Sequence, residues 1–288
     1  SFFLSASIIS HSPRLGNRPQ AFSLDFSWRK CRVFLEPALR LCYNKYSLYR
    51  FDDSSVHFII FFVKERSSKM VVFSMLQYPT IPAKELLSLA KEAGASGVEW
   101  DDISHLHAGH THEASSAYWD AVHADLTPVS LLSHYTLGTK RDIQELFMPV
   151  MDCAFALHTR VVRISPTPTP PDKAAYAVFS SAAQELRTIC DMANIFDMEI
   201  HIICRPGTLT DTPESTKRLI KMANCRNCKC SWQPDSALSD QENLKNLQSL
   251  REFLGSVVEN VSWKKEYTSY LESNLPQIPI ILENGRGS

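Results

Sequence analysis

Residues 198–216, MEIHIICRPGTLTDTPEST, combine a short apolar run, a loop and the start of a helix. The run at 198–204 is largely apolar, which is typical of a strand buried on both faces of a parallel sheet. Thr212 and Pro213 predict the beginning of a helix, because threonine is a favoured N-cap and proline suits the first helical turn. The stretch therefore predicts one strand-loop-helix unit.

The same unit repeats along the chain from Met70 onward. We expect strands at residues 70–75, 96–100, 127–133, 160–165, 198–204, 229–233, 257–263 and 278–284. We expect helices at residues 81–95, 113–125, 140–158, 171–194, from 213, and at 240–253 and 265–273. Strict alternation of this kind predicts an α/β fold with a parallel sheet covered by helices. Eight units predict a TIM (β/α)8 barrel, whose active site lies at the carboxyl ends of its strands.

Two features depart from a complete barrel. Residues 70–288 number about 219, which is near the lower end for this fold. No helical pattern follows the last predicted strand, so we expect a barrel that is incomplete at its C-terminal side. A doubly wound open sheet is the structural alternative, but no GxGxxG motif of dinucleotide-binding proteins follows the first strand.

The charge distribution divides the chain near Met70. Residues 1–69 hold 11 Lys or Arg against 5 Asp or Glu, a net charge of +6, so the remainder carries −7 within a total of −1. The first 50 residues are rich in Ser and Arg and show no sustained period. We expect residues 1–69 to be an N-terminal extension, disordered or non-native, and residues 70–288 to be the barrel domain. A cytoplasmic protein is expected, or a mitochondrial one if the extension acts as a transit peptide.

Composition excludes several classes of protein. With 44% hydrophobic and 21% charged residues, the chain has the composition of an ordinary globular protein. The apolar run at 56–63 is far shorter than the roughly 20 residues that span a bilayer, so we expect no integral membrane segment. The barrel region is net acidic, so we expect no nucleic acid partner.

Three of the eight cysteines form the motif CRNCKC as Cys225, Cys228 and Cys230. Thiolates at this spacing could bind zinc, although no fourth ligand is adjacent. Alternation along a strand places Cys228 and Cys230 on one face, and buried free thiols are the other interpretation.

A histidine-rich run, HLHAGHTH, follows the second predicted strand. His105 and His107 have the HxH spacing of metal ligands, because alternate residues of an extended segment point the same way. Metal-dependent amidohydrolases would need this motif on the first strand, so its position argues against that class. Solvated loop histidines are the alternative to a functional role.

Other polar residues lie at the predicted strand ends, where a barrel binds its ligand. Glu99 could supply a carboxylate and Tyr135 a hydroxyl group to a pocket. Arg163 is a candidate anion contact or a structural ion pair. Arg205, together with the N–H groups of Gly207 and Thr208, would suit a phosphate or carboxylate at the start of a helix. A simple helix cap with Arg205 in a surface salt bridge is the alternative.

From about Met70 to Glu283 the sequence resembles the xylose isomerase-like family of sugar phosphate isomerases and epimerases. The pieces that carry the resemblance, in order, are AKEAGASGVEW, HLHAGH, LTPVSLLSHY, RVVRIS, GTLTDTPEST, WQP and LE. The resemblance implies a TIM barrel with a divalent metal, Mn, Mg or Zn, held at the ends of the later strands. It also implies that a carboxylate removes the proton next to a carbonyl polarised by the metal. In this family the loop of His105 and His107 lines the substrate pocket, which implies that both contact a polyol.

The metal-ligand positions of the family are mostly changed in this chain. The fifth-strand Glu corresponds to Ile203 and the His after it to Arg205. The sixth-strand ligand corresponds to Gln233 and the seventh-strand His to Glu259, whereas the eighth-strand Glu is kept as Glu283. Isoleucine cannot bind a cation or accept a proton, and arginine would repel a dication.

Two hypotheses follow for function. The first is a sugar isomerase or epimerase in which Glu259, Glu283 and Gln233 bind the metal. Either Glu259 or Glu283 then acts as the base. The second is a catalytically impaired barrel that binds a small polar or anionic ligand without turnover. Both predict a small sugar-like partner, and both leave a homo-oligomer open.

Overall fold

The computed structural model describes residues 5–8, 22–25, 41–43, 46–53, 56–63, 70–138 and 142–283. Contacts within the chain divide it into two compact units, Ser1–Ser68 and Lys69–Ser288. None of the helices in these described ranges is long and apolar enough to cross a membrane.

The first unit carries five strands in one antiparallel sheet, in the order β2-β1-β5-β4-β3. They are β1 (Ser5–Ile8), β2 (Phe22–Asp25), β3 (Leu41–Tyr43), β4 (Tyr46–Asp53) and β5 (Val56–Val63). These strands are not predicted from the sequence. The rest of residues 1–69 lies outside the described residues, and the expectation of a disordered or non-native extension stays a prediction.

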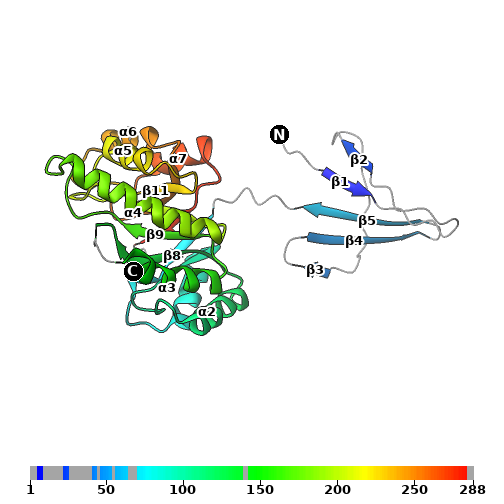
Figure 1. The fold of residues 1–288 in the computed structure, drawn as a ribbon. Helices are drawn as coiled ribbons and strands as arrows, with labels where there is room; N and C mark the ends of the chain where they lie inside the picture. Colours follow the sequence, from blue (N-terminus) through cyan, green and yellow to red (C-terminus); the bar gives the residue numbers. More distant parts are fainter. Residues whose placement is uncertain are drawn as a thin grey trace. The chain divides into compact units, whose positions relative to one another are not determined.

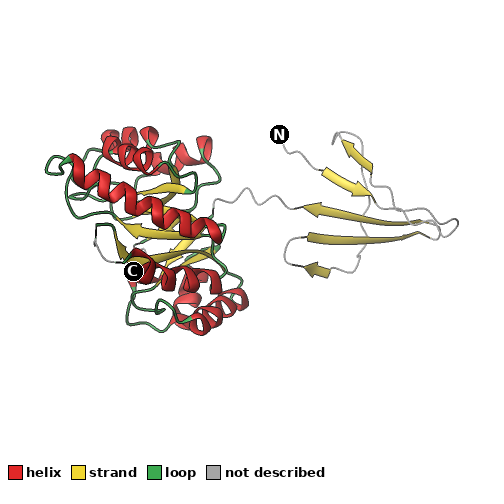
Figure 2. Cartoon of the chain, in the orientation of Figure 1, coloured by secondary structure: helices red, strands yellow, loops and turns green. Residues whose placement is uncertain are grey.

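The second unit is a closed barrel of eight parallel strands, in the order β10-β11-β12-β13-β6-β7-β8-β9 (Figures 1 and 2). The strands are β6 (Val71–Ser74), β7 (Gly97–Asp101), β8 (Thr127–Thr136), β9 (Val161–Ser165), β10 (Glu199–Ile203), β11 (Cys228–Trp232), β12 (Leu254–Glu259) and β13 (Ile280–Leu282). Pairing of β13 with β6 closes the barrel. The predicted TIM barrel is therefore confirmed.

Helices alternate with the strands and cover the outside of the barrel (Figure 2). They are the short 3-10 helix η1 (Met75–Gln77) and the α-helices α1 (Ala83–Glu92), α2 (Thr111–His123), α3 (Ile143–Ala156), α4 (Tyr176–Ile195), α5 (Pro213–Ala223), α6 (Asp240–Ser249) and α7 (Lys265–Asn274). Glu283 is the last described residue after β13, so the expected incomplete cover at that side of the barrel stays a prediction.

One strand is displaced from its predicted position. The sequence predicts a strand at 257–263, whereas β12 spans Leu254–Glu259. Asn260 ends the strand, because its side-chain oxygen accepts a hydrogen bond from the Ser262 amide and its carbonyl accepts one from the Trp263 amide. The apolar residues after Asn260 therefore belong to a loop, where Trp263 packs against Trp232.

Alternate strand residues face the helices or the barrel interior. Residues such as Ile164 and Ile202 join the large core that the strands form with the helices. Val72, Val258 and Ile281 form a separate buried cluster to which no helix contributes. Because β6, β12 and β13 place these three residues in register, this cluster marks the inward-facing positions of the barrel.

Candidate functional site

Arg163 on β9 is the centre of a buried ion network inside the barrel. Its Nη1 atom lies 2.6 Å from Oε1 of Glu99 on β7, and its Nη2 atom lies 3.2 Å from Oε1 of Glu283 after β13. Strands β7, β9 and β13 are not neighbours in the sheet, so these contacts cross the barrel interior. Glu99 also accepts hydrogen bonds from Ser74 at 3.1 Å and Ser130 at 2.7 Å.

The surroundings of Arg163 keep its guanidinium charged. Burial by itself would lower the pKa of Arg163, but the negative charges of Glu99 and Glu283 and their hydrogen bonds outweigh burial and raise it. The side chains of Arg163 and Glu99 are fully buried, whereas that of Glu283 is 29% exposed. A ligand at the carboxyl ends of the strands could reach Glu283. Glu99 and Arg163 expose no side-chain atoms, so neither can form the direct ligand contact that the sequence predicts.

The structure separates the predicted metal ligands. Glu259 pairs in register with Leu282, and Leu282 pairs with Phe73, which faces the helices. Residues in register share one face of the sheet, so Glu259 faces the helices, whereas its neighbour Val258 faces the barrel interior. Glu283 lies one residue beyond Leu282 and contacts the internal Arg163. Among the described residues, no set of three metal-binding side chains at ligand distance contains either glutamate.

These residues do not fit a divalent metal at the position that the family resemblance implies. Ile203 at the end of β10 is only 3% exposed and offers no ligand atom. Glu283 shares its charge with Arg163, and the nearby guanidinium would repel a dication. Gln233 would supply one neutral oxygen ligand, whereas hard cations need several oxygen ligands.

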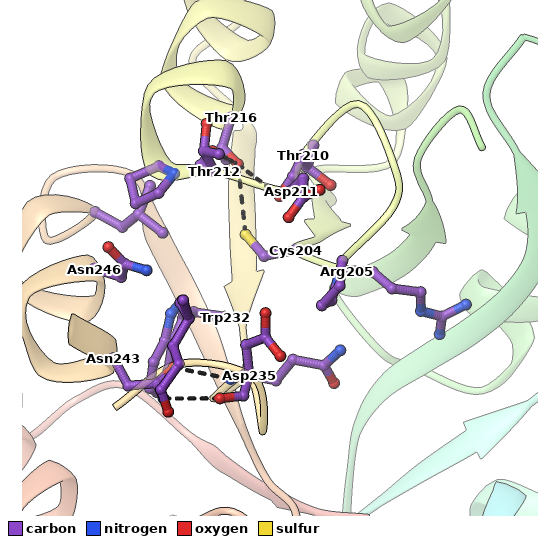
Figure 3. A pocket seen from close by; sticks show the side chains of 15 residues that line it. Cys204, Arg205, Thr210, Asp211, Thr212, Thr216, Trp232, Asp235, Asn243 and Asn246 are labelled. Carbon is purple, nitrogen blue, oxygen red and sulfur yellow. Dashed lines mark hydrogen bonds between the residues drawn. The ribbon is translucent and has the colours of Figure 1, made fainter. Parts of the chain in front are cut away.

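A small pocket lies at the carboxyl ends of β10 and β11, between α5 and α6 (Figure 3). Its cavity volume is about 30 Å³, which is room for a few water molecules. Its polar lining includes the predicted residues Arg205 and Gln233, together with Asp235 and Asn246. Asn243 fixes one wall, because its Oδ1 atom accepts the Asp235 amide at 2.8 Å and its Nδ2 atom donates to the Asp235 carbonyl at 2.9 Å.

The loop before α5 is not an open anion site. The Gly207 amide donates to a carboxylate oxygen of Asp211 at 3.1 Å, so a side chain already uses the N–H group that the sequence assigned to an anion. Thr212 caps the helix as predicted and forms a capping box with Ser215. Arg205 is exposed at the edge of the pocket. This arrangement favours the interpretation of a helix cap.

His105 is buried within the loop that follows β7. Its Nδ1 atom lies 2.7 Å from Asp101, and the two side chains are 4% and 1% exposed. The hydrogen bond with Asp101 raises the pKa of His105 despite burial. Burial pushes the pKa of Asp101 upward, but hydrogen bonds from His105 and the amides of Ser104 and Ile103 outweigh it and lower that pKa. His105 therefore stabilises the loop, and its predicted polyol contact stays a prediction.

The His105–Asp101 pair predicts a pH-dependent contribution to stability. The part due to His105 is complete below its unfolded pKa of about 6.5 and is lost as pH rises through its raised folded pKa. The part due to Asp101 is complete above its unfolded pKa of about 3.9 and is lost as pH falls through its lowered folded pKa. We therefore expect Asp101→Asn to lower the free energy of unfolding most between about pH 4 and 6.5, measured by urea denaturation.

A surface aspartate provides the control for this experiment. Asp125 forms an exposed contact of 3.8 Å with Lys91, and Asp125→Asn should cause a small change at every pH. A cost of Asp101→Asn that is the same at acidic and alkaline pH would contradict the assignment of a charged pair.

His107 and Tyr135 each contact a glutamate of a neighbouring helix. His107 is exposed, and its Nδ1 atom lies 3.0 Å from Glu113 in the first turn of α2. Tyr135 is buried, and its hydroxyl donates to Glu185 of α4 at 2.8 Å, on the helix-facing side of the barrel. Glu185 also accepts the Gly138 amide at 2.9 Å. The Tyr135 hydroxyl is therefore bound to Glu185 in this structure, and its role in substrate binding stays a prediction.

The cysteine motif is a set of buried or partly buried thiols. Cys228 and Cys230 are free and lie on the helix-facing side of β11, as the alternation predicts. The pKa of the Cys230 thiol is raised well above its usual range by its hydrogen bond with Cys204 and by burial. Zinc needs the thiolate form, so this environment favours the interpretation of free thiols.

Asp101 and Glu185 are not predicted from the sequence, although both are buried and both form hydrogen bonds with their neighbours. Asp101 could have been found from the sequence, because the Asp101–Asp102 pair directly follows the second predicted strand. The sequence has no comparable signal for Glu185, because it lies in the middle of a long amphipathic helix.

No family model and no curated protein matches this chain, but many solved structures share its fold. A probable 3-DHS dehydratase, AsbF from Bacillus anthracis, is 14% identical with a TM-score of 0.62, covering 75% of this chain and 93% of its own. A D-allulose 3-epimerase from Methylomonas sp. in complex with D-allulose is 13% identical with a TM-score of 0.58, covering 75% and 84%. The IolI protein with a bound zinc atom is 14% identical with a TM-score of 0.56, covering 75% and 88%. At these identities the likeness shows the fold, and the predicted xylose isomerase-like fold is confirmed.

Proposed function

We propose that this protein is a sugar isomerase or epimerase-type barrel that binds a small sugar-like molecule and no longer performs metal-assisted proton transfer. The observation that carries the proposal is the position of Arg163 between Glu99 and Glu283. The guanidinium of Arg163 is paired with Glu283, the one carboxylate of the family's ligand set that the resemblance finds unchanged in this chain.

The proposed loss of chemistry follows from the residues at the strand ends. Metal-assisted isomerisation needs a cation that polarises the carbonyl and a carboxylate that removes the adjacent proton. Ile203 can provide neither group, and Glu259 lies on the face opposite to the barrel interior. Glu283 alone cannot hold a dication and move a proton while it neutralises Arg163.

The polar side chains around the pocket between α5 and α6 support the proposed ligand class by their chemistry. Gln233 and Asn246 can donate to and accept from hydroxyl groups, while Asp235 and Arg205 add one charge of each sign (Figure 3). A sugar presents many hydroxyl groups that act both as donors and as acceptors. The neighbour that was solved with D-allulose adds that this fold accommodates a ketose.

Binding and turnover of D-allulose by the full chain test the proposal. We expect saturable binding in calorimetry, no conversion of the sugar by NMR, and weaker binding by Gln233→Ala. Gln248→Ala is the matched control, because Gln248 is exposed on α6 and does not line the pocket. Conversion of the sugar, or equal binding by both variants, would contradict the proposal.

A metal-dependent isomerase or epimerase is the second candidate function. It is favoured by Glu283, which keeps the eighth-strand position and is 29% exposed. Titration of Mg²⁺ into the full chain and into Glu283→Gln separates the candidates, because Mg²⁺ prefers oxygen ligands over imidazole. Binding that the variant loses would favour the isomerase, whereas our proposal expects no saturable binding in either.

Ile203→Glu is expected to raise the affinity for Mg²⁺ above that of the unchanged chain. It restores a carboxylate at the end of β10, where the family resemblance implies a metal ligand. Ile203→Gln is the matched control, because it has a similar size without the charge. Equal Mg²⁺ affinity in the Glu and Gln variants would show that Ile203 does not occupy the ligand position.

A further inference from the structure

A second group of metal-binding side chains lies outside the barrel interior. It consists of His107 in the loop after β7, His110 at the N-cap of α2 and Glu113 in the first turn of that helix. One ligand atom from each of the three side chains lies within 4.8 Å of the other two. This is the one group of its kind among the described residues.

We propose that His107, His110 and Glu113 bind a divalent transition-metal ion such as Zn²⁺. Ligands at about 2.0–2.1 Å from a tetrahedral zinc ion are separated from one another by roughly 3.3–3.4 Å. Oε2 of Glu113 lies 3.0 Å from Nδ1 of His107 and 3.9 Å from Nδ1 of His110, so these distances bracket the required value. Small side-chain rotations bring the three atoms onto one ion.

The loop that carries the site is held by contacts of its own. Leu106 is buried at 1% exposure, and the Gly109 amide donates to the Pro149 carbonyl of α3 at 2.9 Å. Gly109 has a φ of 84°, and the turn around it brings the His110 amide to the His107 carbonyl at 2.9 Å. The turn therefore holds the backbones of His107 and His110 close together before any ion binds.

Glu113 is oriented by the same loop. Its Oε2 atom accepts a hydrogen bond from the His107 amide at 3.0 Å, which aims the carboxylate at both histidine rings. A carboxylate has further lone pairs for a metal, so this bond does not block binding. Such second contacts of a metal ligand set its direction.

The donor set determines the class of ion. Two imidazoles and one carboxylate suit zinc, nickel or copper, whereas magnesium and calcium prefer sites made of oxygen ligands. His107 and His110 are 66% and 69% exposed, so water can complete the coordination. The positive end of the α2 dipole opposes a cation, but the charge of Glu113 offsets it. The ion is therefore exchangeable and is independent of the family position at Glu283.

Calorimetric titration of Zn²⁺ into the full chain tests the site. We expect saturable binding of one ion, weakened at least about tenfold by His107→Ala and by Glu113→Gln, because each removes one of three ligands. His123→Ala is the matched control, because His123 is exposed at the other end of α2 and lies outside the group. Glu283→Gln should also leave this binding unchanged, which separates the site from the barrel interior.

Circular dichroism of each variant establishes that the fold is kept. Absence of saturable zinc binding in the full chain would overturn the proposal, as would binding that survives both His107→Ala and Glu113→Gln. Loss of binding in Glu283→Gln with retention in His107→Ala would place the ion in the barrel and would overturn it equally.

Discussion

Arg163→Met is expected to lower the free energy of unfolding by about 3–5 kcal/mol, because it leaves two carboxylates without their buried counter-charge. Glu99 is fully buried and would lose its 2.6 Å contact with Nη1, keeping only the hydroxyl donors of Ser74 and Ser130. Methionine fills much of the volume of arginine, so the loss reports charge more than packing. Urea denaturation followed by circular dichroism measures it.

Two further variants test the cause of that loss. Arg160→Met removes an exposed arginine directly before β9, whose contact with Asp197 is exposed at 79% and 83%, and we expect no measurable change. Adding Glu99→Gln to Arg163→Met removes the stranded charge and should restore part of the stability. A cost of Arg163→Met no larger than that of Arg160→Met would contradict a stabilising ion network of Arg163, Glu99 and Glu283.

Gly255→Ala is expected to destabilise the protein by about 1–3 kcal/mol through overpacking in the barrel. A Cβ atom at Gly255 would contact the ring atoms of His201 too closely, and that ring is only 2% exposed. Hydrogen bonds of His201 with Ser256 and Glu199, both at 3.1 Å, restrain the ring. Burial lowers the pKa of His201, which disfavours a charged ring in this position.

A double-mutant cycle separates the steric cause from other effects. The cost of Gly255→Ala should shrink in a His201→Ala background, because the missing ring leaves room for the new methyl group. Gly94→Ala gives a reference for backbone strain alone, because Gly94 has a φ of 76° and no atom lies within 4 Å of the added Cβ, and its cost should not change in the His201→Ala background. An unchanged cost of Gly255→Ala without the His201 ring would rule out the contact as the cause.

Local signals in the sequence were sufficient for most of the barrel. Short apolar runs and helical repeats predict all eight strands and seven helices, and Thr212 with Pro213 predicts the start of α5. The error at β12 arose because Val261 and Trp263 continue an apolar pattern, although Asn260 turns the chain into a loop. Apolar residues in loops follow the same pattern as strands when they pack against a core.

The candidate site was less predictable than the fold. Family resemblance predicted ligand positions at Ile203 and Glu283 from their place along the chain, but it could not tell on which face Glu259 lies. The register of β12 against β13 decides that, and a shift of one residue exchanges the two faces of a strand. The environment of Tyr135 was hidden for a similar reason, because its partner Glu185 lies 50 residues away on α4.

The sequence by itself determined the order of strands and helices, the capped start of α5 and the apolar character of Ile203 at the end of β10. Each of these depends on residues that are close together in the chain or on the chemistry of one side chain. Only the tertiary structure decided that Arg163 meets Glu99, 64 residues away, and Glu283, 120 residues away. Closure of the barrel brings these charges together, and burial without a partner would cost Arg163 and Glu99 several kcal/mol each.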